Sequence, residues 1–318
     1  MLKILVAVIL ILISPAISAA DDLVKTFSIV GCDPVSGEVG VAVASKYFAV
    51  GSVVPWAKAG VGAIATQAWV NFDYGIDGLE LLEAGLSPQQ VIDSLIALDP
   101  KSSKRQIGVV DFKGNAATFT GNECLPWAGG LTGTNCAVQG NILVSDTVVQ
   151  SMLSAFKNTR AELGDKLLAA LLAGDSAGGD ARGKQSAAMY VVQKMEGLKY
   201  DRKIDIRIDD DPEPFAELSR LYKMSKALNH LDIAGNYYRN GEILKAVKEA
   251  RKAVELGPDI PETYYDLACY LTLAGEFDQA LASIETAINM APRFKSMAAG
   301  DSDLDGLRSF PEFQELIR

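Results

Sequence analysis

The chain has 318 residues, of which 49% are hydrophobic and 22% charged, a composition typical of a globular protein with one large domain and a smaller one. Its net charge of −10, with Lys and Arg dispersed, argues against nucleic-acid binding, because phosphate neutralisation requires a basic surface. The only histidine is His230, which excludes a Ser-His-Asp triad or a histidine-rich zinc site from the preceding part of the chain.

The N-terminal segment 1–20 has the pattern of a signal peptide. Lys3 precedes a short apolar run that ends at Ile13, and the small residues Ser18-Ala19-Ala20 follow. Cleavage after Ala20 would leave Asp21 first and would place the protein in the periplasm or outside the cell. The alternative is an uncleaved anchor, although the run is short for a transmembrane helix.

Three β-rich segments open the mature chain: 26–30, 38–45 and 60–67. The first two flank a turn, Asp33–Gly37, in which Pro and Gly suit the turn geometry. In the second, valines alternate with Gly and Ala, which is typical of a strand pressed against another layer. The sequence predicts a hairpin and a neighbouring strand at the centre of a two-sheet sandwich, with polar residues gathered at one end.

The following elements repeat one pattern, in which two helices follow two strands. The pattern predicts an α+β fold, a four-layer αββα sandwich with paired sheets inside and helices outside. The predicted helices are 74–83, 87–98, 146–156 and 163–173; the predicted strands are 105–111, 116–120, 136–143 and 187–193, with an edge strand at 204–208. Two glycine-rich segments, 121–134 and 178–186, are predicted loops.

Four cysteines are present: Cys32, Cys124, Cys136 and Cys269. Cys124 and Cys136 flank the first glycine-rich loop, so they form a disulfide or remain two separate thiols. No CxxC pair occurs, which argues against a redox motif or a zinc ribbon.

The C-terminal part is predicted to be a helical repeat domain, 215–318, after an acidic linker at 209–214. Gly, Ala and Pro recur 34 positions apart: Gly241 and Gly275, Ala246 and Ala280, Ala253 and Ala287, Pro258 and Pro292. This period resembles the tetratricopeptide repeat. Repeats at about 225–258 and 259–292 would be capped by 215–224 and 304–317. Such repeats resemble modules that bind a protein or peptide on a concave face.

Several separated segments resemble, in order, the domain-of-unknown-function 1028 family. They are Thr26-Phe-Ser-Ile-Val30, Gly40–Ser45, Gly60–Gln67, Arg105-Gln106, Gln139-Gly-Asn141, Gly178–Gly183 and Gln185-Ser186. The family looks like a branch of the N-terminal nucleophile (Ntn) hydrolase fold, and the resemblance covers about residues 26–200. It implies an Ntn-like domain over 26–208.

The resemblance makes Thr26 the candidate nucleophile of an amide hydrolase. In this fold class the first residue attacks through its hydroxyl while its own α-amine serves as base, chemistry that needs no histidine. Thr26 would have to become N-terminal by cleavage after Lys25, since signal-peptide removal leaves Asp21. The alternative is that Thr26 is an ordinary strand residue.

Other polar residues are secondary candidates. Ser45 and Thr66 end small-residue strands and are either catalytic hydroxyls or backbone-bonding strand ends. Amides and charges that would bind substrate or stabilise an oxyanion are Gln67, Asn71, Arg105, Gln139, Asn141, Asp180 and Arg182. Asp180 and Arg182 either pair with each other or clamp a polar substrate. No metal, cofactor or nucleotide is expected.

These observations predict an exported amide hydrolase that acts on a small peptide-like or amino-acid-derived substrate. One alternative is a non-catalytic binding or scaffold protein of the same fold. Another is hydrolysis by carboxylates such as Asp111 and Asp180. By analogy with both fold classes, we expect a homo-oligomer.

Overall fold

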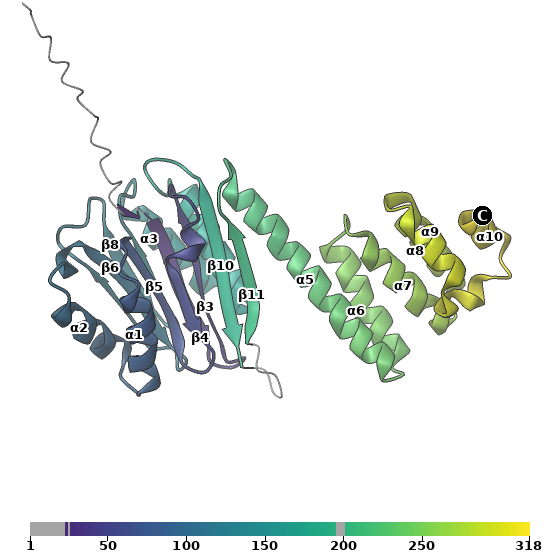
Figure 1. Cartoon of the computed structure of the whole chain (residues 1–318), viewed down its shortest axis with the longest axis horizontal. Coiled ribbons are helices and arrows are strands. Elements are labelled where there is room, and N and C mark those ends of the chain that lie inside the picture. The colour runs from purple at the N-terminus through teal and green to yellow at the C-terminus, as the bar shows by residue number, and fades with distance from the viewer. Residues whose placement is uncertain (1–22, 25, 195–200) are drawn as a thin grey trace, which may run out of the picture.

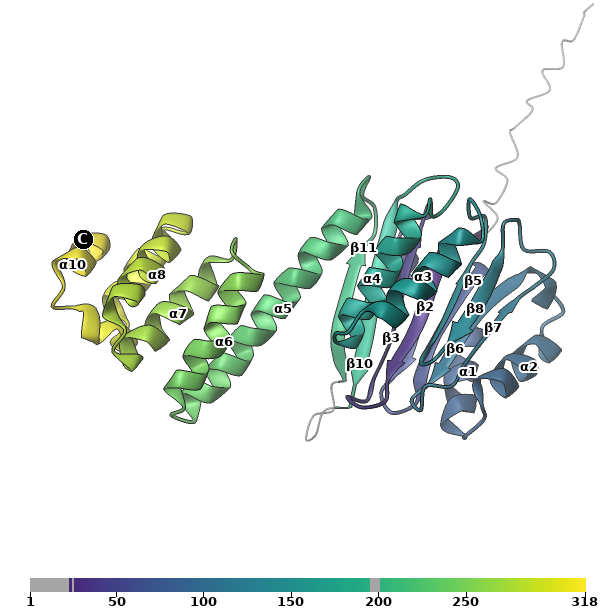
Figure 2. The same ribbon diagram turned by 180° about the vertical axis from the view of Figure 1, so that it is seen from behind.

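The computed structural model describes residues 23–24, 26–194 and 201–318, so the predicted signal peptide lies outside the described residues. Two antiparallel sheets face each other, and each carries a pair of helices on its outer side (Figures 1 and 2). A helical region follows from residue 214. The predicted mixture of two packed sheets with a C-terminal helical region is therefore confirmed.

One sheet, which we call the first sheet, has the strand order β1-β5-β6-β7, with β4 also paired to β5. Its outer face contacts α1 and α2 through Ile64, Ile107 and Val109. Ala63 and Ala65 alternate with Ile64 along β5 and face the second sheet. The helix α2 begins with a capping box between Ser87 and Gln90. The bounds are β1 Leu23–Val24, β4 Pro55–Lys58, β5 Gly62–Trp69, β6 Arg105–Asp111, β7 Ala116–Thr120, α1 Asp73–Glu83 and α2 Pro88–Leu98.

The second sheet has the order β11-β10-β3-β2-β9-β8 and is covered by α3 and α4. The predicted edge strand is β11, and it lies at the edge. The bounds are β2 Thr26–Asp33, β3 Glu38–Ser45, β8 Gly129–Gly133, β9 Cys136–Gly140, β10 Ser186–Gln193, β11 Arg202–Ile208, α3 Thr147–Asn158 and α4 Leu163–Ser176. Short 3-10 helices lie at Val50–Ser52, Ser102–Lys104 and Ser302–Leu307.

The prediction of a loop over 121–134 is wrong for residues 129–133, which form β8. Glycine is unfavourable in strands in general. Here it allows a close approach, because a Cβ on Gly130 would lie 2.7 Å from Thr118 Oγ1. Packing between neighbouring strands thus overrides the local preference of this segment.

The helix α5, Pro214–Arg239, belongs to two hydrophobic cores. Phe215, Leu218 and Tyr222 pack in the core of the second sheet and its helices, whereas Leu231 and Ala234 pack in the core of the helical region. The prediction that 215–224 caps the repeats is therefore wrong, since this half of the helix covers the sandwich. The preceding acidic segment is also tied to the sandwich, because the amide of Asp211 donates to the carbonyl of Gln185 at 2.8 Å.

The rest of the helical region consists of helices paired along the chain: α6 Ile243–Leu256, α7 Pro261–Ala274, α8 Phe277–Met290, α9 Arg293–Gly300 and α10 Pro311–Ile317. The alanines that recur with the 34-residue period are fully buried where helices meet, and the recurring glycines have φ of +77° and +79° at helix ends. Alanine permits close helix packing, and glycine adopts positive φ without strain. Among the described residues, none of the helices is long and apolar enough for a membrane span.

Candidate functional site

Three hydroxyl residues lie opposite one another in neighbouring strands of the second sheet. In the register of β2, β3 and β10, Thr26 pairs with Ser45, and Ser45 pairs with Ser186. All three are buried, and Thr26 Oγ1 donates to Ser45 Oγ at 3.1 Å. Ser186 Oγ donates to the carbonyl of Tyr47 at 2.5 Å. We call Thr26, Ser45 and Ser186 the hydroxyl row.

Beside the hydroxyl row, polar side chains from both sheets form a buried amide network, which we define as Ser28, Gln67, Gln106, Gln139 and Asn141. Gln139 Nε2 donates to Ser28 Oγ at 2.6 Å, and Ser28 Oγ donates to Gln67 Oε1 at 2.6 Å. Gln67 Nε2 and Asn141 Nδ2 donate to Gln106 Oε1 at 2.8 and 2.9 Å. The network thereby links the two sheets at the end where β2 begins.

The network holds the backbone of Thr26. The carbonyl of Thr26 accepts from Gln67 Nε2 at 3.3 Å and from the amide of Asn141 at 3.0 Å. Gln67, Gln139 and Asn141 are at most 1% exposed and donate hydrogen bonds within the protein, and two of them, Gln67 and Asn141, position the carbonyl of Thr26. The predicted role of these amides in substrate binding or oxyanion stabilisation stays a prediction.

One buried acceptor of the network lacks a partner. Gln139 Oε1 has no hydrogen-bond partner among the described residues. It lies against the backbone of Gly108, where an added Cβ would come within 2.1 Å of it. The absence of a side chain at Gly108 is what allows the Gln139 amide to fit between the sheets.

Two predicted residues do not join this site. Thr66 precedes Gln67 on β5 and therefore points to the opposite face, since side chains alternate along a strand. Its hydroxyl donates to the carbonyl of Asn71 at 3.3 Å. Asn71 accepts from the amide of Asp73 at 3.2 Å at the start of α1, which is a local turn interaction.

Arg105 has a structural ion pair. Its Nε lies 2.7 Å from Asp99 Oδ2, and its Nη1 donates to the carbonyl of Trp69 at 2.6 Å. Burial opposes ionisation of Asp99, but hydrogen bonds from Arg105 and the Lys101 amide outweigh it and lower the pKa of the carboxyl. The pair joins the start of β6 to Asp99, and Arg105 also bonds to the end of β5. Among the contacts of the described residues, none joins this pair to Thr26.

Asp180 and Arg182 pair with each other. Asp180 accepts from Arg182 Nε and Nη2 at 3.0 and 2.6 Å and from the amide of Lys46 at 3.0 Å, while Arg182 Nη1 donates to the carbonyl of Lys46 at 2.7 Å. The pair therefore fastens the glycine loop to the end of β3, next to Ser45. Asp111 lies at the other end of the first sheet, where it pairs with Gly62 in the register of β6 and β5.

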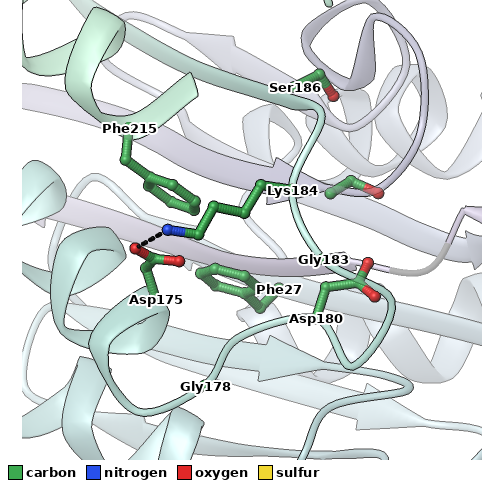
Figure 3. A pocket seen from close by; sticks show the side chains of 9 residues that line it. Phe27, Asp175, Gly178, Asp180, Gly183, Lys184, Ser186 and Phe215 are labelled. Atoms are coloured by element: carbon green, nitrogen blue, oxygen red, sulfur yellow. Dashed lines mark hydrogen bonds and ion pairs between the residues drawn. The ribbon is translucent and has the colours of Figure 1, made fainter. Parts of the chain in front are cut away.

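A small cavity of about 90 Å³ opens at the same end of the second sheet (Figure 3). It is lined by residues from β2, β3, β10, α4, α5 and the glycine loop: Phe27, Ser45, Asp175, Gly178, Asp180, Gly183, Lys184, Ser186 and Phe215. Asp175, Lys184 and Phe215 were not predicted, because they carry no local motif and meet only through tertiary packing.

The thiols, and the one group of side chains close enough to share a metal ion in the described residues, lie away from this cavity. All four cysteines are free, so the structure has separate thiols at Cys124 and Cys136, and burial raises the pKa of each to about 11. Within the described residues, the group of side chains close enough to share a metal ion is Cys269, Asp301 and Asp303 in the helical region. Around Thr26, no such group is found among the residues that the structure describes.

Comparison with known proteins gives one family. A family model described as "Family of unknown function (DUF1028)" matches residues 26–218. A crystal structure of a protein from Silicibacter pomeroyi, described under the same family, has 31% sequence identity and a TM-score of 0.58, covering 64% of this chain and 89% of that one. No curated protein matches the chain.

Proposed function

The chain belongs to the DUF1028 family, and we propose that it is an exported amide hydrolase of the N-terminal nucleophile type with Thr26 as nucleophile. The observation that carries the proposal is the position of Thr26. It begins the buried central strand β2, its hydroxyl is hydrogen-bonded to Ser45, and its carbonyl is held by Gln67 and Asn141. A hydroxyl held in one geometry is what a nucleophile requires.

The proposed reaction uses the α-amine that Thr26 acquires when the bond to Lys25 is cut. This amine takes the hydroxyl proton as Oγ1 attacks the carbonyl carbon of a substrate amide. The carbon–nitrogen bond then breaks, the leaving nitrogen takes the proton, and an ester to Thr26 remains. Water hydrolyses the ester, which releases the acid and restores the hydroxyl.

The geometry suggests distinct roles for the neighbouring groups. The side-chain amides of the network already donate elsewhere, so backbone N–H groups are the donors we propose for the oxyanion. Ser45 connects Thr26 to the cavity, because it bonds to the one and lines the other. The Asp180–Arg182 pair would keep the end of β3, and with it Ser45, in place.

A specific observation favours the alternative, a non-catalytic binding protein. In the precursor the chain continues ahead of Thr26, and Leu23 and Val24 pair with Trp69 and Ala68 as β1. An acylated Thr26 has no amine base. The protein would then act as a scaffold, whose tetratricopeptide-like helices bind a protein or peptide partner and support a homo-oligomer.

The mature N-terminus decides between the two. Intact mass and N-terminal sequencing of protein from its native host are expected to give Thr26 as the first residue, with Asp21 as the contrary outcome. For a chain that begins at Thr26, hydrolysis of short peptide amides is expected to disappear in Thr26→Ala. A matched Thr66→Ala variant, on the opposite face of β5, is expected to retain hydrolysis.

A further inference from the structure

The ammonium group of Lys184 occupies one side of the cavity. Its Nζ lies 2.8 Å from Asp175 Oδ2 and 5.2 Å from the centroid of the Phe215 ring. The Phe215 ring stacks on Phe27 with centroids 6.1 Å apart. Figure 3 shows the Lys184 side chain reaching past these two rings to Asp175.

These are the groups that bind a primary ammonium ion. A carboxylate forms short charge-assisted bonds with it, and an aromatic face attracts it through the ring quadrupole. Asp175 also lies in the last turn of α4, where the helix carbonyls favour positive charge. The other carboxylate of the lining, Asp180, is already bound by Arg182 and the Lys46 amide, so Asp175 is the acceptor that a cation would use.

Lys184 has a second partner outside the cavity. Its Nζ is 4.0 Å from Glu213 Oε2, and the Glu213 side chain is 72% exposed. The lysine can therefore turn outward and keep an ion pair. The cavity of about 90 Å³ exceeds the roughly 10–15 Å³ that one water molecule requires, which suits an ammonium group with a short carbon stem.

We propose that the cavity is an ammonium-binding subsite and that Lys184 is an internal competitor, whose ammonium group occupies the Asp175 side of the cavity in the ligand-free protein. The ligand class is a small primary amine that carries an amide, such as an amino-acid amide or the N-terminus of a short peptide. Ser45 lines the cavity and bonds to Thr26, so the amide of such a ligand would lie near the nucleophile. This inference deepens the proposed function and rests on it only for that last step.

Binding at equilibrium tests the subsite. The full chain is titrated with glycinamide, with neutral acetamide and with acetate, and binding is followed by calorimetry or by NMR shifts. We expect glycinamide to bind while the other two do not. Lys184→Met, which keeps much of the volume and removes the competitor, is expected to lower the Kd for glycinamide about tenfold, and Asp175→Asn is expected to raise it about tenfold or more.

The matched control is Glu83→Gln, which removes the carboxylate of the exposed Lys58–Glu83 pair between β4 and α1 and should leave the Kd unchanged. Weaker glycinamide binding by Lys184→Met, preferred binding of acetate, or no glycinamide binding by the folded wild-type protein would each overturn the subsite. The wild-type comparison of the three probes decides even where a variant fails to fold. The titration measures binding, and hydrolysis is measured in the separate assay of the proposed function. Hydrolysis without amine binding refutes this inference alone, and amine binding without hydrolysis refutes the proposed function alone.

Discussion

A methyl group added at Gly108 probes the buried contact that organises the amide network. Gly108 lies on β6 in the first sheet and faces the Gln139 amide of the second sheet. A Cβ built at Gly108 would lie 2.1 Å from Oε1, 2.5 Å from Cδ and 2.6 Å from Nε2 of Gln139. A comfortable carbon–oxygen contact is about 3.3 Å or more, so the amide would have to retreat by about 1 Å.

Burial and a hydrogen bond oppose this movement of the Gln139 amide. Gln139 is fully buried, and its Nε2 is bonded at 2.6 Å to Ser28, which is also fully buried. Overpacking of this kind costs about 1–3 kcal/mol, and the loss of the Gln139–Ser28 hydrogen bond adds about 1 kcal/mol. We therefore expect Gly108→Ala to lower the free energy of unfolding of the sandwich by about 3 kcal/mol.

The assay can isolate the sandwich. The three tryptophans, Trp56, Trp69 and Trp127, all precede α5, so urea unfolding followed by tryptophan fluorescence reports this part of the chain. Gln139→Ala removes the obstructing amide and is expected to cost about 2 kcal/mol by itself. The double variant is expected to cost about the same 2 kcal/mol, which gives a coupling energy of about 3 kcal/mol.

Gly60→Ala, in the turn between β4 and β5 of the same sheet, serves as the control. Its Cβ would meet nothing within 4 Å, but its φ is +74°, so the expected loss of about 1 kcal/mol comes from backbone strain alone. The reasoning is refuted if Gly108→Ala is within 0.5 kcal/mol of the wild type, or if the two single losses simply add in the double variant.

Three further outcomes are expected. Arg105→Met removes the guanidinium from Asp99, whose side chain is 9% exposed, and should cost about 3 kcal/mol in urea unfolding. Because the folded pKa of Asp99 is lowered, its contribution is present above the unfolded value of about 4 and is lost as the pH falls below that value. An acid-insensitive difference between the wild type and Asp99→Asn would contradict the assignment. Leu218→Ala in α5, fully buried against the second sheet, should lower the tryptophan-detected stability by about 2–4 kcal/mol, whereas an unchanged transition would show that this half of α5 is not part of the sandwich core. Cys136 is buried and Cys124 is half-buried, and the pKa of each thiol is raised to about 11. A thiol-specific reagent at pH 8 should therefore react slowly with the native protein and label all 4 cysteines after denaturation. Labelling of only two would indicate a disulfide.

The sequence predicted most of the elements of the sandwich correctly. Alternation of valine with small residues identifies β3, and the apolar spacing with its capping residues identifies α1 and α2, because these signals arise between residues close along the chain. The 34-residue period likewise located the paired helices. The strand β8 was missed because its glycines have low strand preference and are selected by contact with Thr118 on another strand.

Part of the candidate site was likewise predicted from the sequence, and the rest was decided by the structure. From the sequence alone, the single histidine excluded a histidine triad, the family resemblance marked Thr26, and its position at a strand end marked Ser45. Which polar residues meet was decided by register, which placed Ser186 beside Ser45 and turned Thr66 to the opposite face.

The tertiary structure alone brought Lys184 to Asp175 between Phe27 and Phe215, from four separate parts of the chain. Local propensities extend over a few residues, whereas a cavity is made by long-range packing of whole elements, whose pairing leaves no periodic trace in the sequence.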